Sequence, residues 1–194
     1  AFFKALLFLG AGSVIHGMNG EQDITKMGGL KKKMPRTYWT FLVATLAIAG
    51  IPGLAGFFSK DEILWGAWSS GNKMVWLTQA AAAGLTAFYM FRLVYLTFWG
   101  KFRGGDEAES HVHESINLLT GPLMVLAVLA AGGGWIGIPK VLSFGKDINL
   151  FHHWLAPAIS VPHGDGHGAE AGHSAGLEFG LMALAVGIAL SGIF

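Results

Sequence analysis

The chain has 194 residues, of which 53% are hydrophobic and only 13% are charged, and its formal net charge is +1. Soluble domains usually carry about 25% charged residues, so this composition, with a mean hydropathy of +0.51, indicates a membrane protein. The near-neutral charge argues neither for nucleic acid nor for an acidic substrate as a partner. The lack of cysteine excludes disulfides, cysteine-ligated iron–sulfur clusters and thiolate catalysis within these residues.

The first predicted helix covers residues 1–18 and carries one charge, Lys4. The sequence begins and ends in apolar runs and has no signal-peptide n-region, so we expect an internal fragment whose first span starts upstream. His16, near the helix end, lies 12 residues after Lys4, which is about 18 Å along a helix axis. A lysine stem cannot snorkel that far, so Lys4 is expected near the membrane midplane, where ionisable residues are functional candidates. The alternative places Ala1 at the interface and makes Lys4 an ordinary anchor.

A polar and basic loop follows over residues 21–36. Its basic residues are Lys26, Lys31, Lys32, Lys33 and Arg36. Such a run could bind lipid headgroups or nucleic acid. The interpretation we adopt is a short cytoplasmic connection that obeys the positive-inside rule.

The long apolar stretch at residues 38–70 is the most unusual part of the sequence. Its 33 residues would make one straight helix of roughly 50 Å, far longer than the bilayer core of about 30 Å. It contains the segment Gly50–Gly56, which holds three glycines and one proline and is therefore poor helix material. Ser59 and Glu62 then fit a capping box that would start a new helix.

Two arrangements fit this stretch. In one, residues 38–58 form a kinked span and the SKDE sequence is an exposed cap. In the other, half-helices at 38–50 and 59–70 are separated by residues 51–58, and Lys60 lies at mid-membrane depth. Trp65 and Trp68 favour the broken helix, because they then fall in the far aromatic belt.

The rest of the chain continues the helical pattern. Further spans are predicted at about residues 74–99, 116–138 and 175–194. A short helix is expected within residues 146–159, followed by a tract rich in glycine and histidine. Its histidines, His163, His167 and His173, could chelate a metal, but we interpret the tract as a solvent-exposed loop.

Three stretches become recognisable when taken together: AFFKALLFLGAGSVIH at the start, EQDITKMGGLKKKMPRTYW in the first loop, and AGIPGLAGFFSKDEIL around the break. They resemble the antiporter-like proton-pumping family, in the branch of the L subunits of bacterial NADH:quinone oxidoreductase (respiratory complex I). The strong match covers about residues 1–70, and HESINLLTGPLMVLA at 113–127 resembles a weaker family pattern. Residues 128–194 agree only in hydropathy and order.

The resemblance implies roles for four residues. Lys4 matches a lysine of the buried polar axis that follows the membrane midplane. Lys60 matches the lysine on a discontinuous helix that ends the proton relay towards the outer side, and Asp61 matches its acidic neighbour. Burial lowers the pKa of a lysine and nearby carboxylates raise it, so such a group can exchange protons near neutral pH. His16, beside the basic loop, could be an entry group for protons or an ordinary interfacial histidine.

The sequence therefore predicts an all-α membrane protein, a fragment of a multi-span transmembrane helix bundle with about five spans, one of them discontinuous. The resemblance implies a proton-translocating subunit of NADH:quinone oxidoreductase in the bacterial inner membrane. Its partners would be other membrane subunits, the lipid bilayer and protons, with flavin and iron–sulfur clusters in other subunits and no cofactor or metal in this chain. The alternatives are a subunit of a multi-subunit cation/proton antiporter, and a structural scaffold in which Lys4 and Lys60 tolerate substitution.

Overall fold

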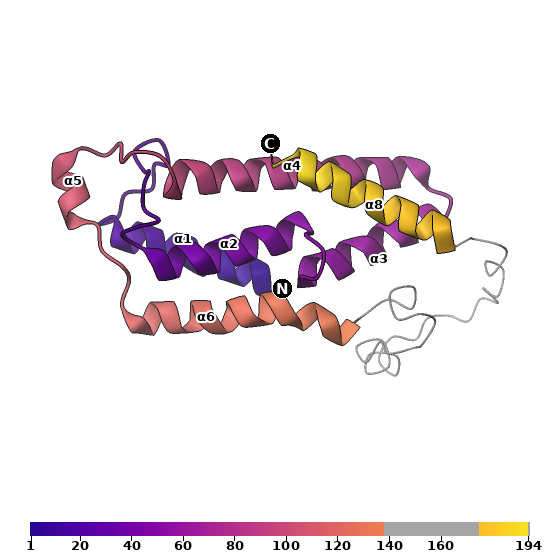
Figure 1. Cartoon of the computed structure of the whole chain (residues 1–194), viewed down its shortest axis with the longest axis horizontal. Helices are drawn as coiled ribbons and strands as arrows, with labels where there is room; N and C mark the ends of the chain where they lie inside the picture. Colours follow the sequence, from indigo (N-terminus) through magenta and orange to yellow (C-terminus); the bar gives the residue numbers. More distant parts are fainter. Residues whose placement is uncertain (138–174, 194) are drawn as a thin grey trace.

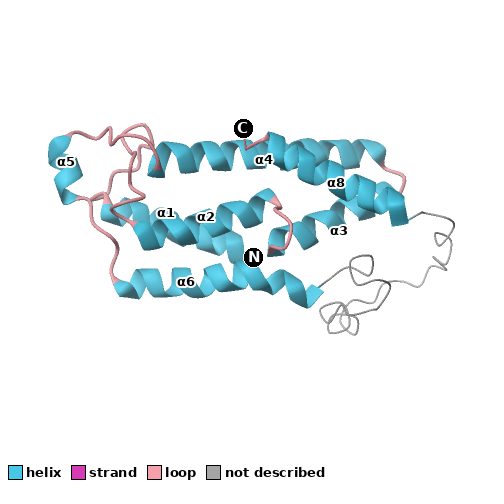
Figure 2. Cartoon of the chain, viewed as in Figure 1, coloured by secondary structure: helices cyan, strands magenta, loops and turns pink. Residues whose placement is uncertain are grey.

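The computed structural model describes residues 1–137 and 175–193, and this part of the chain is helical without β-strands (Figure 2). In chain order its elements are α1 (Phe2–Gly17), α2 (Pro35–Ala49), α3 (Ala55–Ser69), α4 (Lys73–Phe98), α5 (Asp106–His111), α6 (Asn117–Gly132), the 3₁₀ helix η1 (Gly133–Gly137) and α8 (Ala175–Ser191). The predicted all-α helix bundle with one discontinuous member is confirmed.

The helices run side by side around the interrupted pair α2 and α3. Helices α4 and α8 lie on one side of this pair and α6 on the other, and α1 packs against both α2 and α6 (Figure 1). Within the described residues, α4 and the stretch Asn117–Ile136 are each long and apolar enough to cross a membrane, while α1 and residues Gly176–Ser191 of α8 are shorter apolar helices.

The break between α2 and α3 is shorter than the sequence predicted. It covers residues 50–54, and α3 already begins at Ala55. The capping box predicted at Ser59 is therefore wrong, because the residue that precedes α3 is Leu54, in an extended conformation, and no side chain caps this helix. The Ser59 hydroxyl instead donates to the carbonyls of Ala55 and Gly56 inside the helix.

An aromatic and aliphatic core joins α1, α2 and α4 near the basic loop. The Tyr38 and Phe41 rings of α2 lie 5.3 and 5.6 Å from the ring of Phe98, which is 1% exposed at the end of α4. Met27 and Leu30 of the loop are buried in the same cluster. The loop is thus folded onto the bundle, with its lysines outside and its apolar residues inside.

A buried polar cluster fixes the start of α2. The hydroxyls of Ser13 and Thr37 are hydrogen-bonded at 2.8 Å, and the Ser13 hydroxyl also donates to that of Ser115 at 2.8 Å. The Glu114 carboxylate accepts from the Thr37 hydroxyl at 2.6 Å and from the Arg36 backbone N–H at 2.8 Å. Glu114 therefore satisfies backbone donors in the first turn of α2, where a negative charge is favoured by the helix dipole.

Two predictions fall outside the described residues: the short helix within 146–159 and the histidine tract with His163, His167 and His173. The connection between α4 and α6 contains the short helix α5. The connections from α1 to α2, α4 to α5 and α5 to α6 gather at one end of the bundle, while the turn between α3 and α4 lies at the other end (Figure 2).

Candidate functional site

The helix break is built by a glycine in the left-handed conformation. Gly50 has φ 87° and ψ 33°, a conformation that a side chain disfavours. Its N–H donates to the Ala47 carbonyl and the N–H of Ile51 donates to the Leu46 carbonyl, both at 3.1 Å. These two bonds form a Schellman motif, and Pro52, two positions further on, cannot continue the helix. The sequence thus ends α2 by a strong local signal.

A second glycine lets the two halves pack closely. A Cβ atom built on Gly56, in the first turn of α3, would overlap the carbonyl oxygen of Ala47 and lie 2.8 Å from its carbonyl carbon. The obstacle is backbone, so it cannot move aside as a flexible side chain would. The first turn of α3 therefore lies directly against the last turn of α2.

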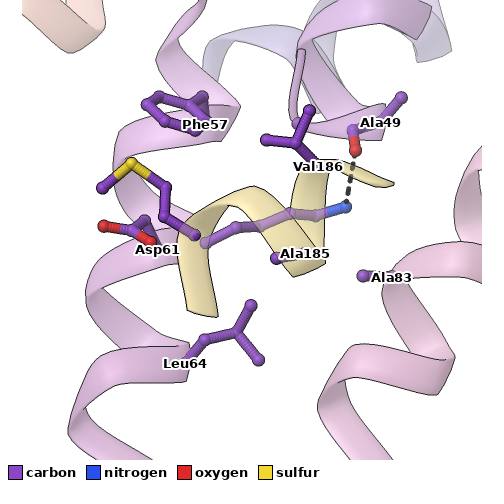
Figure 3. A pocket seen from close by; sticks show the side chains of 10 residues that line it. Ala49, Phe57, Asp61, Leu64, Ala83, Ala185 and Val186 are labelled. Atoms are coloured by element: carbon purple, nitrogen blue, oxygen red, sulfur yellow. Dashed lines mark hydrogen bonds between the residues drawn. The ribbon is translucent and has the colours of Figure 1, made fainter. Parts of the chain in front are cut away.

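Lys60 reaches back across the break from α3 to α2. Its Nζ donates to the carbonyl oxygen of Ala49, the last residue of α2, at 3.4 Å, drawn as the dashed line in Figure 3. The stem passes Gly50 so closely that a Cβ there would lie 3.1 Å from the Lys60 Cδ. A cation at this position is stabilised by the free carbonyls and by the negative end of the α2 dipole. The charged amine of this half-buried lysine is thus stabilised by backbone groups that the helix break already holds in place.

A small cavity surrounds this lysine. Its volume is about 20 Å³, enough for about one water molecule. It is lined by Ala49, Gly50, Phe57, Lys60, Asp61, Leu64, Ala83, Met182, Ala185 and Val186. Helices α2, α3, α4 and α8 all contribute to it, so a change in the packing of any of them would change its size.

Asp61, the next residue along α3, also lines the cavity. It is only 8% exposed, and its carboxylate lies away from the Ala49 carbonyl in Figure 3. Among the described residues, Asp61 forms no ion pair with Lys60, in keeping with the different directions of adjacent helix positions. An amine and a carboxylate that do not pair with each other thus both line the cavity.

Glu178 is an acidic neighbour that the sequence reasoning missed. It lies in the first turn of α8, near enough for its charge to act on Asp61, as the charge of Glu62 on α3 also does. Met182, one turn further along the same face of α8, packs against Phe57 and Phe58 of α3, which brings this face of α8 onto α3. A lone acidic residue at the start of a strongly apolar segment was the signal that could have identified it.

The other two predicted residues lie elsewhere. Lys4 is exposed on α1, on the same side as Phe8, which is 80% exposed. His16 is exposed at the opposite end of α1, and its ring meets that of His113 edge to face with centroids 5.7 Å apart. Of the four predicted residues, only Lys60 and Asp61 are brought together at one cavity.

This arrangement suits proton transfer more than metal binding. It offers a half-buried amine, a buried carboxylate, a second carboxylate nearby and space for about one water. Across residues 1–137 and 175–193, no group of three or more histidine, cysteine or acidic side chains comes together that could hold a metal ion.

Comparison with known proteins gives a consistent family. Residues 1–86 match the family described as "NADH:quinone oxidoreductase/Mrp antiporter, TM". The chain is 44% identical to the "NAD(P)H-quinone oxidoreductase chain 5" of Picosynechococcus sp., over 100% of this chain and 31% of that protein. It is 43% identical to the "NADH-quinone oxidoreductase subunit L" of Rhodobacter capsulatus, over 81% of this chain and 24% of that protein.

A third relative has the same name. The "NADH-quinone oxidoreductase subunit L" of Rickettsia conorii is 48% identical, over 78% of this chain and 23% of that protein. The chain thus spans about a quarter to a third of the length of the curated relatives it matches.

Proposed function

The chain belongs to the NADH:quinone oxidoreductase/Mrp antiporter family of membrane proteins, and from this premise we propose that it is part of the L-type proton-translocating subunit of a bacterial NADH:quinone oxidoreductase. In this role it moves protons across the inner membrane while electrons pass through other subunits. The observation that carries the proposal is Lys60, seated across a helix break beside a cavity with room for about one water. Discontinuous helices are a common way to build ion sites in transporters.

The proposed step at this site is a proton transfer from the Lys60 ammonium. The carbonyl of Ala49 and the end of α2 stabilise the charged form. When the cavity takes up a water, the ammonium gives its proton to that water and becomes a neutral amine. The carboxylate of Asp61, which lines the same cavity, accepts the proton, and Glu178 extends the acidic path along α8.

Lys4 and His16 have supporting roles in this proposal. Lys4 belongs to a polar path that continues through parts of the protein outside this sequence, and its exposure on α1 leaves it accessible to such parts. His16 lies beside the basic loop and faces His113, where it would take up protons from the cytoplasmic side. The flavin and the iron–sulfur clusters of the complex would lie in other subunits.

A subunit of a multi-subunit cation/proton antiporter is the second candidate, because the description of the matched family includes such antiporters. The names of the relatives favour the redox-linked complex. The two functions differ in their partners. Purification of the full-length protein with NADH-oxidising subunits would support the first candidate, and purification with antiporter subunits alone would support the second.

The experiment that tests the proposed site is the Lys60→Ala substitution in the assembled complex. Redox-linked proton pumping, measured as protons moved per electron in membrane vesicles, should fall while the complex still assembles. Lys73→Ala is the matched control, because Lys73 is an exposed lysine whose amine lies over the Trp68 ring, 5.7 Å from its centroid, at the far end of α3. A normal proton-to-electron ratio in the Lys60→Ala complex would reject the role assigned to this lysine.

A further inference from the structure

A second, larger hollow lies at the opposite end of the bundle from α3, and we call it the basic groove. Its volume is about 570 Å³, and it is lined by Gly28, Gly29, Lys31, Lys32, Lys33, Phe98, Trp99, Gly100, Lys101, Phe102 and Glu109. Four lysines against one glutamate make its lining strongly positive. None of the proposed proton-transfer residues contributes to it.

Backbone hydrogen bonds hold together the two loops that form the groove. The N–H of Gly29 donates to the Trp99 carbonyl and the N–H of Lys31 donates to the Phe98 carbonyl, both at 3.1 Å. Gly28 has φ +145°, and a Cβ atom on it would overlap the carbonyl of Lys101. The loop after α1 and the loop after α4 are therefore joined along their backbones, and the groove is a built feature of the fold.

The four lysines are held in different ways. Lys33 is paired with the Glu109 carboxylate at 3.3 Å. The amine of Lys31 lies over the rings of Tyr38 and Trp99, at 5.1 and 4.8 Å from their centroids. Within residues 1–137 and 175–193, Lys32 and Lys101 form no ion pair. Two cations of the groove thus remain available to an external anion.

The aromatic residues around the groove place it at the membrane surface. Trp99 follows the last turn of α4, and its ring stacks edge to face on that of Tyr95 at 5.4 Å. Trp39, next to Tyr38 on α2, is 59% exposed. Tryptophan and tyrosine mark the headgroup level of membrane proteins. Below this level α4 presents exposed apolar side chains, including Phe88 and Leu85, against which acyl chains can lie.

From these observations we infer that the basic groove binds the phosphate headgroup of an anionic phospholipid. Lys32 and Lys101 contact the phosphate, Lys31 adds a third positive charge, and the acyl chains extend along α4. A soluble phosphate ion would use the charges but would gain nothing from the exposed apolar surface beside them. This site is independent of the proton-transfer proposal.

The test uses the full-length protein in its assembled complex, placed in nanodiscs of phosphatidylcholine with a small fraction of phosphatidylglycerol. Native mass spectrometry measures the phosphatidylglycerol that the complex retains. Each lysine near a membrane surface contributes about fivefold in affinity for anionic lipid, so Lys32→Gln with Lys101→Gln should weaken retention by about thirtyfold. The charge-conserving pair Lys32→Arg with Lys101→Arg should retain the lipid.

The matched control is Lys73→Gln, because Lys73 also lies over a tryptophan ring but at the other end of the bundle. Equal loss of lipid in this control would show a general charge effect and would overturn the assignment. Unchanged phosphatidylglycerol retention in the double glutamine variant would also overturn the assignment. The same holds if the unmodified complex retains no phosphatidylglycerol because another protein segment fills the groove. The assignment would also be overturned if inorganic phosphate, tested in nanodiscs of pure phosphatidylcholine, bound through the same lysines as tightly as phosphatidylglycerol does.

Discussion

The Gly56→Ala substitution should uncouple the two halves of the broken helix without touching a charged group. The added Cβ atom would meet the Ala47 carbonyl, with the carbonyl carbon at 2.8 Å, whereas ordinary van der Waals contact begins at 3.4 Å. Because both partners are backbone, α3 must move away from α2 as a unit. Overpacking of this kind costs about 1–3 kcal/mol.

The displacement should also move the Lys60 amine away from the Ala49 carbonyl. Its hydrogen bond to Ala49 is already at 3.4 Å, near the outer limit for an N–H···O bond, so a shift of a few tenths of an ångström breaks it. We therefore expect Gly56→Ala to lower proton pumping per electron although Lys60 and Asp61 are intact. The assay measures the proton-to-electron ratio in vesicles, together with the thermal stability of the purified complex.

Gly66→Ala provides the matched control on the same helix. A Cβ atom on Gly66 would have nothing within 4 Å, and alanine is favoured over glycine inside a helix by about 1 kcal/mol. This variant should pump normally and be equally stable or slightly more stable. If Gly56→Ala behaved like Gly66→Ala in both measurements, the close packing of α3 on α2 would not control the site, and the reasoning would be refuted.

Three further substitutions test other parts of the structure. Glu178→Gln should slow proton pumping several-fold, because it removes the stronger of two acidic charges that act on the buried carboxylate of Asp61. Glu62→Gln, which removes the weaker charge from the exposed face of α3, should have a smaller effect in the same vesicle assay. Glu114→Gln should lower the free energy of unfolding by about 1–2 kcal/mol, because charged hydrogen bonds to the first turn of α2 are lost. Thermal unfolding of the complex measures this loss, and Glu107→Gln, at an exposed position of α5, serves as the control. Gly28→Ala should separate the two loops of the basic groove, which limited proteolysis would detect as faster cleavage.

The broken helix could be predicted from the sequence because its signals are local. Gly50 and Pro52 end a helix whatever surrounds them, and the length of the apolar stretch requires an interruption. The start of α3 could not be predicted in the same way. Ser59 and Glu62 formed a plausible cap, but the packing of Gly56 on α2 starts the helix four residues earlier. A tertiary contact thus prevailed over a local propensity.

The polar contacts that the sequence did not reveal are all long-range. Ser13 and Ser115 are 102 positions apart and are hydrogen-bonded in the core. A serine in an apolar helix has many roles, so neither residue alone indicated this pairing. Glu178 and Asp61 are likewise neighbours only because α8 packs on α3. Lys60, by contrast, was singled out by its charge inside an apolar stretch and by its match to the FFSKDEIL motif.

The arrangement around Lys60 suggests how transfer could be controlled without large movements. The amine donates to the Ala49 carbonyl, and Asp61 lines the same cavity. The two groups form no ion pair among the described residues. In the proposed mechanism the proton therefore passes through the cavity, whose volume of about 20 Å³ is close to the minimum for one water. Because α8 supplies Met182, Ala185 and Val186 to its wall, a small shift of α8 would admit or expel that water. Under the proposed mechanism, hydration of the cavity, set by the packing of α8, would connect the lysine to its acceptor or disconnect it.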